Sequence, residues 1–161
     1  NSEIVSLGQR EPVYAEPSLD VEVNNDGKVV KDSMSVTQGK LVLGLNVNLD
    51  DFDQQFDVMI YNSILGGTAS SKLFQNVREK ASLAYTVGSN FMKVKNIILV
   101  RCGIEIKNYD EALKIVKEQL EQMKNGDFTD QDVEIAKKSL IDSIQTIDDD
   151  QDTEILYFFG Q

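Results

Sequence analysis

The sequence predicts an α+β fold, a two-layer sandwich in which a mostly antiparallel sheet carries helices on one face. Three observations support this class. Large apolar side chains recur at every second position in residues 41–49, which is typical of a strand with one buried face. Two further apolar segments, 84–94 and 97–106, are separated only by Lys95 and Asn96, as in a hairpin. From residue 108 onward, apolar residues instead recur at three- and four-residue spacing, which indicates helices.

The first elements are an arm and a strand. Residues 1–20 contain both prolines and little periodicity, and we interpret them as a linker or extended arm. A turn signal at 24–27 precedes a short mixed segment, 29–36, for which we expect a strand. The strongly alternating strand at 41–49 follows.

Two helices are expected between this strand and the hairpin. Aspartates at 50, 51 and 53 favour the positive end of a helix dipole and so predict a helix start. Gly66 and Gly67 are expected to end that helix, because glycine accepts the left-handed conformation. Ser70 is predicted to cap the next helix, which extends to about Ala81.

The second half of the chain predicts core residues. Alternate positions of the second hairpin strand share one face: Ile98, Val100, Cys102, Ile104 and Ile106. Cys102 is therefore interpreted as a small core residue and not as a nucleophile. A helix is expected from Asn108 to a stop at Gly126.

Thr129 and Asp132 resemble a capping box for a last helix. Its predicted inward positions are Val133, Ala136, Leu140, Ile144 and Ile147. The acidic run 148–150 is interpreted as a solvated break and not as a calcium loop, since calcium ligands are spaced around a glycine turn. The apolar segment 155–159 then ends the chain, which suggests truncation within a helix.

Composition excludes several functions. The 161 residues suit one domain, and 16 Lys and Arg against 27 Asp and Glu give a net charge of -11. This balance argues against binding to nucleic acid or to an anionic membrane surface. No apolar run reaches the ~20 residues that span a bilayer. A single cysteine excludes an internal disulfide and fits a reducing compartment, so we expect a cytoplasmic location.

The sequence contains no histidine. Without imidazole it cannot form a Ser-His-Asp triad or a zinc motif such as H-x-x-E-H, so we expect neither a metal site nor a complete catalytic site in this chain. Two candidates remain. The Gly66–Ser71 segment could present backbone N–H groups to an anion, although a tight turn between helices is the favoured interpretation.

The second candidate is the pair Arg78 and Tyr85. A guanidinium and a phenol can both donate hydrogen bonds to peptide oxygens, and so could grip a peptide backbone or a developing oxyanion. The alternative is structural: Arg78 pairs with a neighbouring acid, and Tyr85 is a packed strand aromatic.

Around these residues the sequence resembles a known family. The segments 64–67, 70–75, 77–80 and 83–85 are similar to the signature of the carboxy-terminal domain of insulinase (pitrilysin-type) zinc peptidases. The resemblance covers about residues 29–161, and we assign 21–161 to this domain, truncated at its carboxy-terminal end. It implies that Arg78 and Tyr85 match an arginine and a tyrosine that bind the substrate backbone.

The resemblance also implies where the zinc site lies and what the whole protein does. Zinc would be held by H-x-x-E-H in a separate amino-terminal domain of the same or a partner chain, so this fragment alone should be inactive. The whole protein would be a zinc metalloendopeptidase that degrades peptides, possible as a homodimer or heterodimer. The alternative is a non-catalytic subunit or scaffold half of a heterodimer, since some family members have lost the zinc motif. A third reading, a stand-alone ligand-binding domain, ignores the truncated ends.

Overall fold

A computed structural model describes residues 27–51 and 53–146. The chain separates into two compact units, 1–30 and 31–161, and the fold below is that of the second unit. The predicted arm at 1–20, the acidic run at 148–150, the apolar segment at 155–159 and the inward position of Ile147 lie outside the described residues. The domain division after residue 20 stays a prediction.

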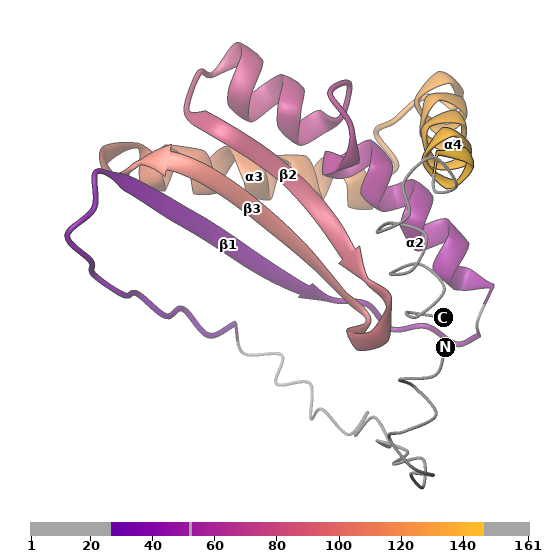
Figure 1. The fold of residues 1–161 in the computed structure, drawn as a ribbon, viewed down its shortest axis with the longest axis horizontal. Coiled ribbons are helices and arrows are strands. Elements are labelled where there is room, and N and C mark those ends of the chain that lie inside the picture. Colours follow the sequence, from indigo (N-terminus) through magenta and orange to yellow (C-terminus); the bar gives the residue numbers. More distant parts are fainter. Residues whose placement is uncertain (1–26, 52, 147–161) are drawn as a thin grey trace, which may run out of the picture. The chain divides into compact units, whose positions relative to one another are not determined.

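Three antiparallel strands form the sheet of the described region, in the order β1-β3-β2 (Figure 1). They are β1 Gln38–Asn46, β2 Ala84–Met92 and β3 Ile97–Glu105. The hairpin prediction is confirmed, because β2 and β3 pair directly across a 3₁₀ turn, Lys93–Lys95. Asn96 closes this turn with a left-handed backbone, φ 50°. The short connection therefore sets the register of the central strand against its neighbour.

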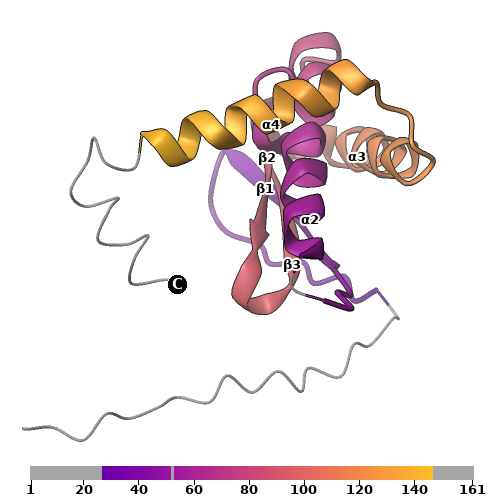
Figure 2. The same cartoon turned by 90° about the vertical axis from the view of Figure 1, so that its right-hand side faces the viewer.

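The helices follow the predicted order. They are α2 Gln54–Asn62, α3 Tyr109–Lys124 and α4 Asp130–Gln145, with π-helical turns at Ser63–Gly67 and Phe74–Lys80. In Figure 1 α3 lies behind the sheet, and in Figure 2 it lies to one side of the strands, so it covers one sheet face. The α+β class with helices on one face is confirmed.

The core lies between that sheet face and the helices. Ile98, Val100, Cys102 and Ile104 of β3 are buried together with residues of the helical turns and of α3. The other members of this core include Leu41, Leu65, Leu73, Val77, Ala112 and Val116. Cys102 is 2% exposed, which confirms its assignment to the core. The period-two pattern of β3 therefore identified the buried face correctly.

Several start and stop signals are confirmed. The Oδ1 atom of Asp51 accepts a hydrogen bond from the backbone N–H of Gln54, at the start of α2, over 3.0 Å. Gly126 has φ 74° just after α3, as a left-handed helix stop requires. Thr129 and Asp132 form the predicted capping box at the start of α4. These local signals work because each involves residues close together in sequence.

Several local predictions are wrong. No strand forms within 29–36, where the residues are exposed and lie outside the sheet ladder, and a strand needs such a ladder. Ser70 does not cap a helix: its hydroxyl lies 3.0 Å from that of Thr68, and the N-cap position of the Phe74–Lys80 turn is Leu73. Two predicted inward positions are exposed. Ile106 is 60% exposed because β3 ends one residue earlier. Ile144 is 50% exposed near the end of α4, a helix in which Ala136 is the one fully buried residue.

Candidate functional site

Gly66, near the end of the helical stretch that runs from α2 to Gly67, has a packing role. A Cβ atom on Gly66 would lie 2.6 Å from the backbone nitrogen of Ser89 in β2. Neither Gly66 nor Gly67 has a positive φ, so the predicted left-handed stop is wrong; the helical path instead ends where Thr68 becomes extended. The tight turn between helices is confirmed, since the backbone N–H of Ser71 donates to the carbonyl of Thr68 over 3.2 Å between two helical stretches.

Two hydrogen bonds fasten the end of α2 to β2. The Ser89 hydroxyl donates to the carbonyl oxygen of Asn62 over 3.2 Å, and Asn62 Nδ2 donates to the Ser89 carbonyl over 3.5 Å. The absence of a side chain at Gly66 permits this close approach. The strand that carries Tyr85 is thus held against the helical layer at its middle.

Arg78 lies in the last turn of the second helical segment. Its guanidinium carbon is 4.7 Å from the centre of the Phe74 ring, and its Nε atom is 3.7 Å from a carboxylate oxygen of Glu79. Both contacts are local, and the side chain is about half exposed. The cation–π contact holds the guanidinium beside the helix while leaving donors free for other partners.

A reverse turn joins this helix to β2. The backbone N–H of Ser82 donates to the carbonyl of Arg78 over 3.1 Å, and that of Leu83 donates to the carbonyl of Val77 over 3.0 Å. Ser82 has φ 53°, a left-handed conformation that is uncommon outside glycine. These bonds reverse the chain direction within a few residues and so fix Tyr85 shortly after the helix that carries Arg78.

Tyr85 is the extra residue of a β-bulge. Ala84 pairs with Ile104 and Thr86 pairs with Gly103, so two residues of β2 advance while β3 advances one. Ala84 is buried on the helix side. Because of the bulge, Tyr85 and Thr86 both lie on the opposite face, which we call the open sheet face. It comprises these two residues, the β3 positions 97, 99, 101, 103 and 105, which alternate with the buried ones, and Val42 of β1, which pairs with Arg101.

The tyrosine hydroxyl is engaged on this face. It donates a hydrogen bond to Glu105 Oε1 over 3.1 Å, and the other oxygen of Glu105 lies 2.7 Å from the ammonium nitrogen of Lys107. The hydrogen bond to Glu105 raises the pKa of the Tyr85 phenol, and the hydrogen bond from Lys107 lowers the pKa of Glu105. The Tyr85 side chain is nevertheless accessible, since the residue is 53% exposed.

Arg78 and Tyr85 therefore each contact their own neighbours, and no direct hydrogen bond joins them. Their role as a substrate-binding pair stays a prediction. Sequence reasoning missed Glu105 and Lys107. The alternation of β3 puts residue 105 on the face opposite Cys102, but only the bulge in β2 brings the tyrosine to that face as well.

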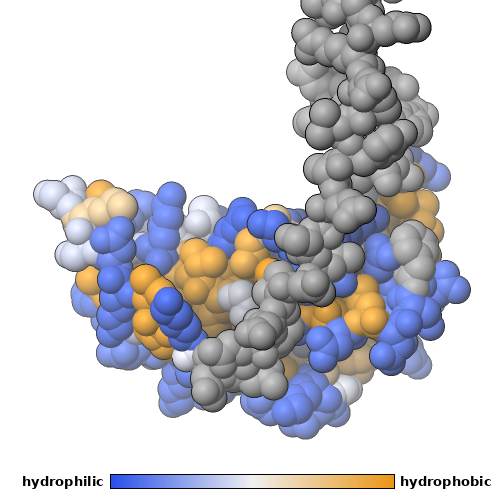
Figure 3. All heavy atoms as spheres, turned by 90° about the horizontal axis from the view of Figure 1, so that it is seen from below, coloured by the Kyte–Doolittle hydropathy of each residue, from blue (hydrophilic) through white to orange (hydrophobic). Residues whose placement is uncertain are grey.

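The open sheet face mixes apolar and charged groups. Val42 of β1 and Arg101 of β3 pair directly, and both are exposed. Figure 3 views the molecule from below, at right angles to Figure 1, and on that side too apolar patches reach the surface between polar ones. The open sheet face thus presents apolar side chains together with hydrogen-bonding groups.

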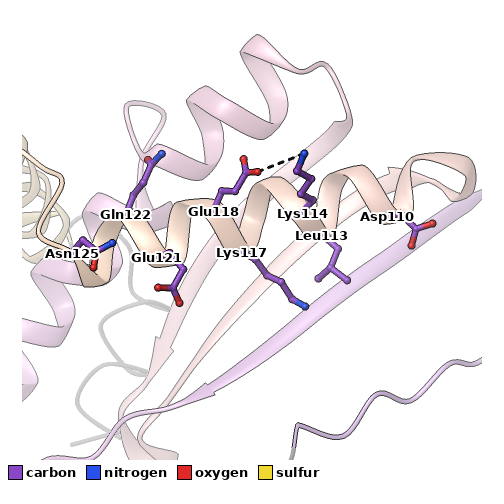
Figure 4. Close-up of a pocket in the computed structure, with 8 residues that line it drawn as sticks. All are labelled: Asp110, Leu113, Lys114, Lys117, Glu118, Glu121, Gln122 and Asn125. Carbon is purple, nitrogen blue, oxygen red and sulfur yellow. Dashed lines mark ion pairs between the residues drawn. The ribbon is translucent and has the colours of Figure 1, made fainter.

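A surface hollow on α3 is a weaker candidate for a binding site. Its described lining comes from this one helix, as Figure 4 shows: Asp110, Leu113, Lys114, Lys117, Glu118, Glu121, Gln122 and Asn125. Lys114 and Glu118 form an exposed ion pair of 3.9 Å there. These mostly charged side chains of successive turns are typical of a solvated helix surface.

The remaining candidates for chemistry are the Cys102 thiol and the acidic side chains. Burial raises the pKa of the Cys102 thiol to about 11, so the thiol stays protonated at neutral pH. Within 27–51 and 53–146, no group of three or more Cys, Asp or Glu side chains is arranged to hold a metal ion. In the same part of the chain, no helix has the length and apolar character needed to cross a bilayer.

Comparison with known proteins identifies the class. The sequence profile of the peptidase M16 inactive domain matches residues 3–140. A Bacillus subtilis protein described as "Probable inactive metalloprotease YmfF" is 42% identical over 123 residues, which cover 75% of this chain and 29% of that protein. A second protein of the same organism, "Uncharacterized zinc protease YmxG", is 28% identical over 109 residues, which cover 66% of this chain and 27% of that protein.

A solved structure agrees. The crystal structure of a peptidase M16 inactive domain from Pseudomonas fluorescens superimposes with a TM-score of 0.60 at 30% identity, covering 68% of this chain and 27% of that one. The fold and these similarities define an inactive-type domain of a zinc protease family. The chain belongs to the M16 peptidase family and corresponds to its inactive domain. It spans less than a third of the length of both Bacillus relatives.

Proposed function

We propose that this chain is the substrate-binding domain of a zinc-dependent metalloendopeptidase that degrades peptides. Arg78 and Tyr85 hold the peptide backbone opposite the zinc site of a separate amino-terminal domain, in the same chain or in a partner of a homo- or heterodimer. The observation that carries the proposal is the bulge at Tyr85, which turns this side chain to the open sheet face, 53% exposed, within an M16 domain.

The chemistry of both side chains supports this role. Arg78 keeps unused guanidinium donors on a side chain held against Phe74, and such planar donors match carbonyl oxygens. Tyr85 adds a phenol on a strand that is fastened to the helical layer through Ser89 and Asn62. Donors held by rigid elements are the kind that stabilise substrate or transition state without reorganising.

Zinc itself does not fit this chain. The sequence has no histidine, and its described acidic residues form no cluster that could hold a metal ion. Zinc ligands would have to come from the separate domain, where the metal would supply the hydrolytic chemistry. What this chain contributes is peptide binding and orientation.

The test is to purify the full-length protein that carries this domain, measure zinc per chain, and assay cleavage of a quenched unstructured peptide. About one zinc per chain, as a single catalytic site requires, together with chelator-sensitive cleavage is the expected result. Full-length protein without zinc and without cleavage would contradict an active peptidase.

A second candidate is a non-catalytic subunit or scaffold half of a heterodimeric peptidase. Its support is the relative YmfF, 42% identical, which is described as a probable inactive metalloprotease. Under this hypothesis the full-length protein cleaves nothing alone, but mixing it with a zinc-bearing family member restores cleavage. The Tyr85→Phe variant then weakens that restored activity, since the tyrosine acts on the partner's substrate.

A further inference from the structure

We propose that Glu105 is a competing acceptor that restrains Tyr85, so that a peptide carbonyl must displace the Glu105 carboxylate before it can accept the tyrosine hydrogen bond. The proposal rests on the proposed function of Tyr85 and adds a regulating residue to that site. It is drawn from the bond between the Tyr85 hydroxyl and Glu105 Oε1, 3.1 Å, on the open sheet face.

The argument begins with a count of protons. A phenol carries one O–H donor, and in this structure Tyr85 uses it to donate a hydrogen bond to Glu105. A peptide carbonyl is only an acceptor, so it cannot share the same donor in good geometry. Peptide binding through the Tyr85 hydroxyl and the bond to Glu105 are therefore alternatives.

Of the two acceptors, the Glu105 carboxylate forms the stronger hydrogen bond with the Tyr85 hydroxyl. Hydrogen bonds to an ionised acceptor are stronger than those to a neutral carbonyl. The pKa of Glu105 is lowered, first by the hydrogen bond from Lys107 and then by that from Tyr85, so the carboxylate is ionised at neutral pH. The pKa of Tyr85 is raised by the same contact, so its hydroxyl keeps the proton.

Lys107 keeps the carboxylate in place. Its ammonium nitrogen lies 2.7 Å from the Glu105 oxygen that the tyrosine does not use. Glu105 is thus held by a cation on one oxygen and by the phenol on the other. All three groups are at the surface, so exchange with an incoming peptide needs only side-chain rotation and no change in the sheet.

The test is a double-mutant cycle in the full-length protein, using a fluorescently labelled unstructured peptide and anisotropy to measure Kd. Glu105→Gln replaces the charged acceptor with a neutral one of the same size, and should tighten binding by about three- to tenfold, the scale of one hydrogen-bond exchange. Tyr85→Phe should weaken binding, and Glu105→Gln should have no effect when Tyr85 is already Phe. Glu134→Gln, in the exposed pair with Lys137 on α4, is the matched control.

A direct readout of the contact accompanies the affinities. NMR titration of the Tyr85 phenol should give a lower pKa in Glu105→Gln than in wild type, because the contact with Glu105 raises that pKa. An unchanged phenol pKa overturns the proposal, and so does weaker or unchanged peptide binding by Glu105→Gln when Tyr85→Phe weakens it. Failure of the wild-type protein to bind any peptide instead overturns the proposed function and this inference with it.

Discussion

At the scale of single residues, Gly66 sets how closely the helical layer approaches the strand that carries Tyr85. A Cβ atom there would meet the Ser89 nitrogen at 2.6 Å, the Ser89 hydroxyl oxygen at 2.7 Å and Leu73 Cδ1 at 2.9 Å. The first of these atoms belongs to the backbone, which cannot turn aside as a side chain can. Glycine is therefore required at position 66 because a side chain would clash with β2, and not because the backbone has a positive φ.

We predict that Gly66→Ala destabilises the chain by about 1–3 kcal/mol, the usual cost of overpacking a filled site. Gly67→Ala is the matched control, since outside its own helical backbone its Cβ would come no closer than 3.4 Å to any atom, the nearest being the carbonyl oxygen of Asn62. That change should be within about 1 kcal/mol of neutral or stabilising, because alanine favours helix over glycine. Urea unfolding measures both, and equal stability of the two variants would refute the packing role.

At the scale of elements, α4 depends on its first turn. It buries only Ala136 fully, whereas α3 buries four residues, so the capping box matters more to α4 than to a deeply buried helix. The backbone N–H and the hydroxyl of Thr129 each donate to Asp132 Oδ2 over 2.8 Å, and the Asp132 N–H donates to the Thr129 hydroxyl over 3.2 Å. The hydrogen bond from the Thr129 backbone N–H, followed by that from its hydroxyl, lowers the pKa of Asp132.

Thr129→Ala should cost about 1 kcal/mol of stability, as loss of an N-cap does. The Asp132 contribution has a defined pH dependence. Because the folded pKa lies below the unfolded value of 3.8, the ionised carboxylate stabilises the fold above that pH, and the effect is lost as pH falls through the folded pKa. Urea unfolding should therefore separate wild type from Asp132→Asn at pH 7, and this difference should shrink only as pH falls below 3.8 and through the folded pKa of Asp132. A difference that does not change with pH would contradict this assignment.

The same scale explains which elements the sequence predicts. The hairpin of β2 and β3, the stop at Gly126 and the capping box depend on neighbours in sequence, so local patterns suffice. The strand expected at 29–36 fails because a strand needs a partner, and no local pattern says whether one is present. The bulge at Tyr85 also escapes prediction, since it exists only in the register between β2 and β3.

The candidate site divides in the same way. The residue types, their spacing and the family resemblance together single out Arg78 and Tyr85, although their substrate-binding role is a proposal. Glu105 could not be connected with Tyr85, from which it is twenty residues distant, without the strand pairing. Residues that act through contacts between strands become visible only when the register is known.

At the scale of the whole molecule, the chain corresponds to one domain of the M16 peptidase family. It matches less than a third of each Bacillus relative, and it has no histidine for zinc. Its proposed contribution is to hold a peptide while another domain cleaves it. Such a division predicts that changes in this domain alter turnover without altering the amount of bound zinc.

The most direct test is therefore the kcat/KM of the full-length protein for a quenched peptide, with Arg78→Ala and Tyr85→Phe compared with wild type at equal zinc content. Each single variant should lose ~10²–10³ in kcat/KM if its donor stabilises the transition state. Tyr109→Phe, a half-buried tyrosine at the start of α3, serves as the control and should stay close to wild type. Wild-type activity in both Arg78→Ala and Tyr85→Phe would contradict the account.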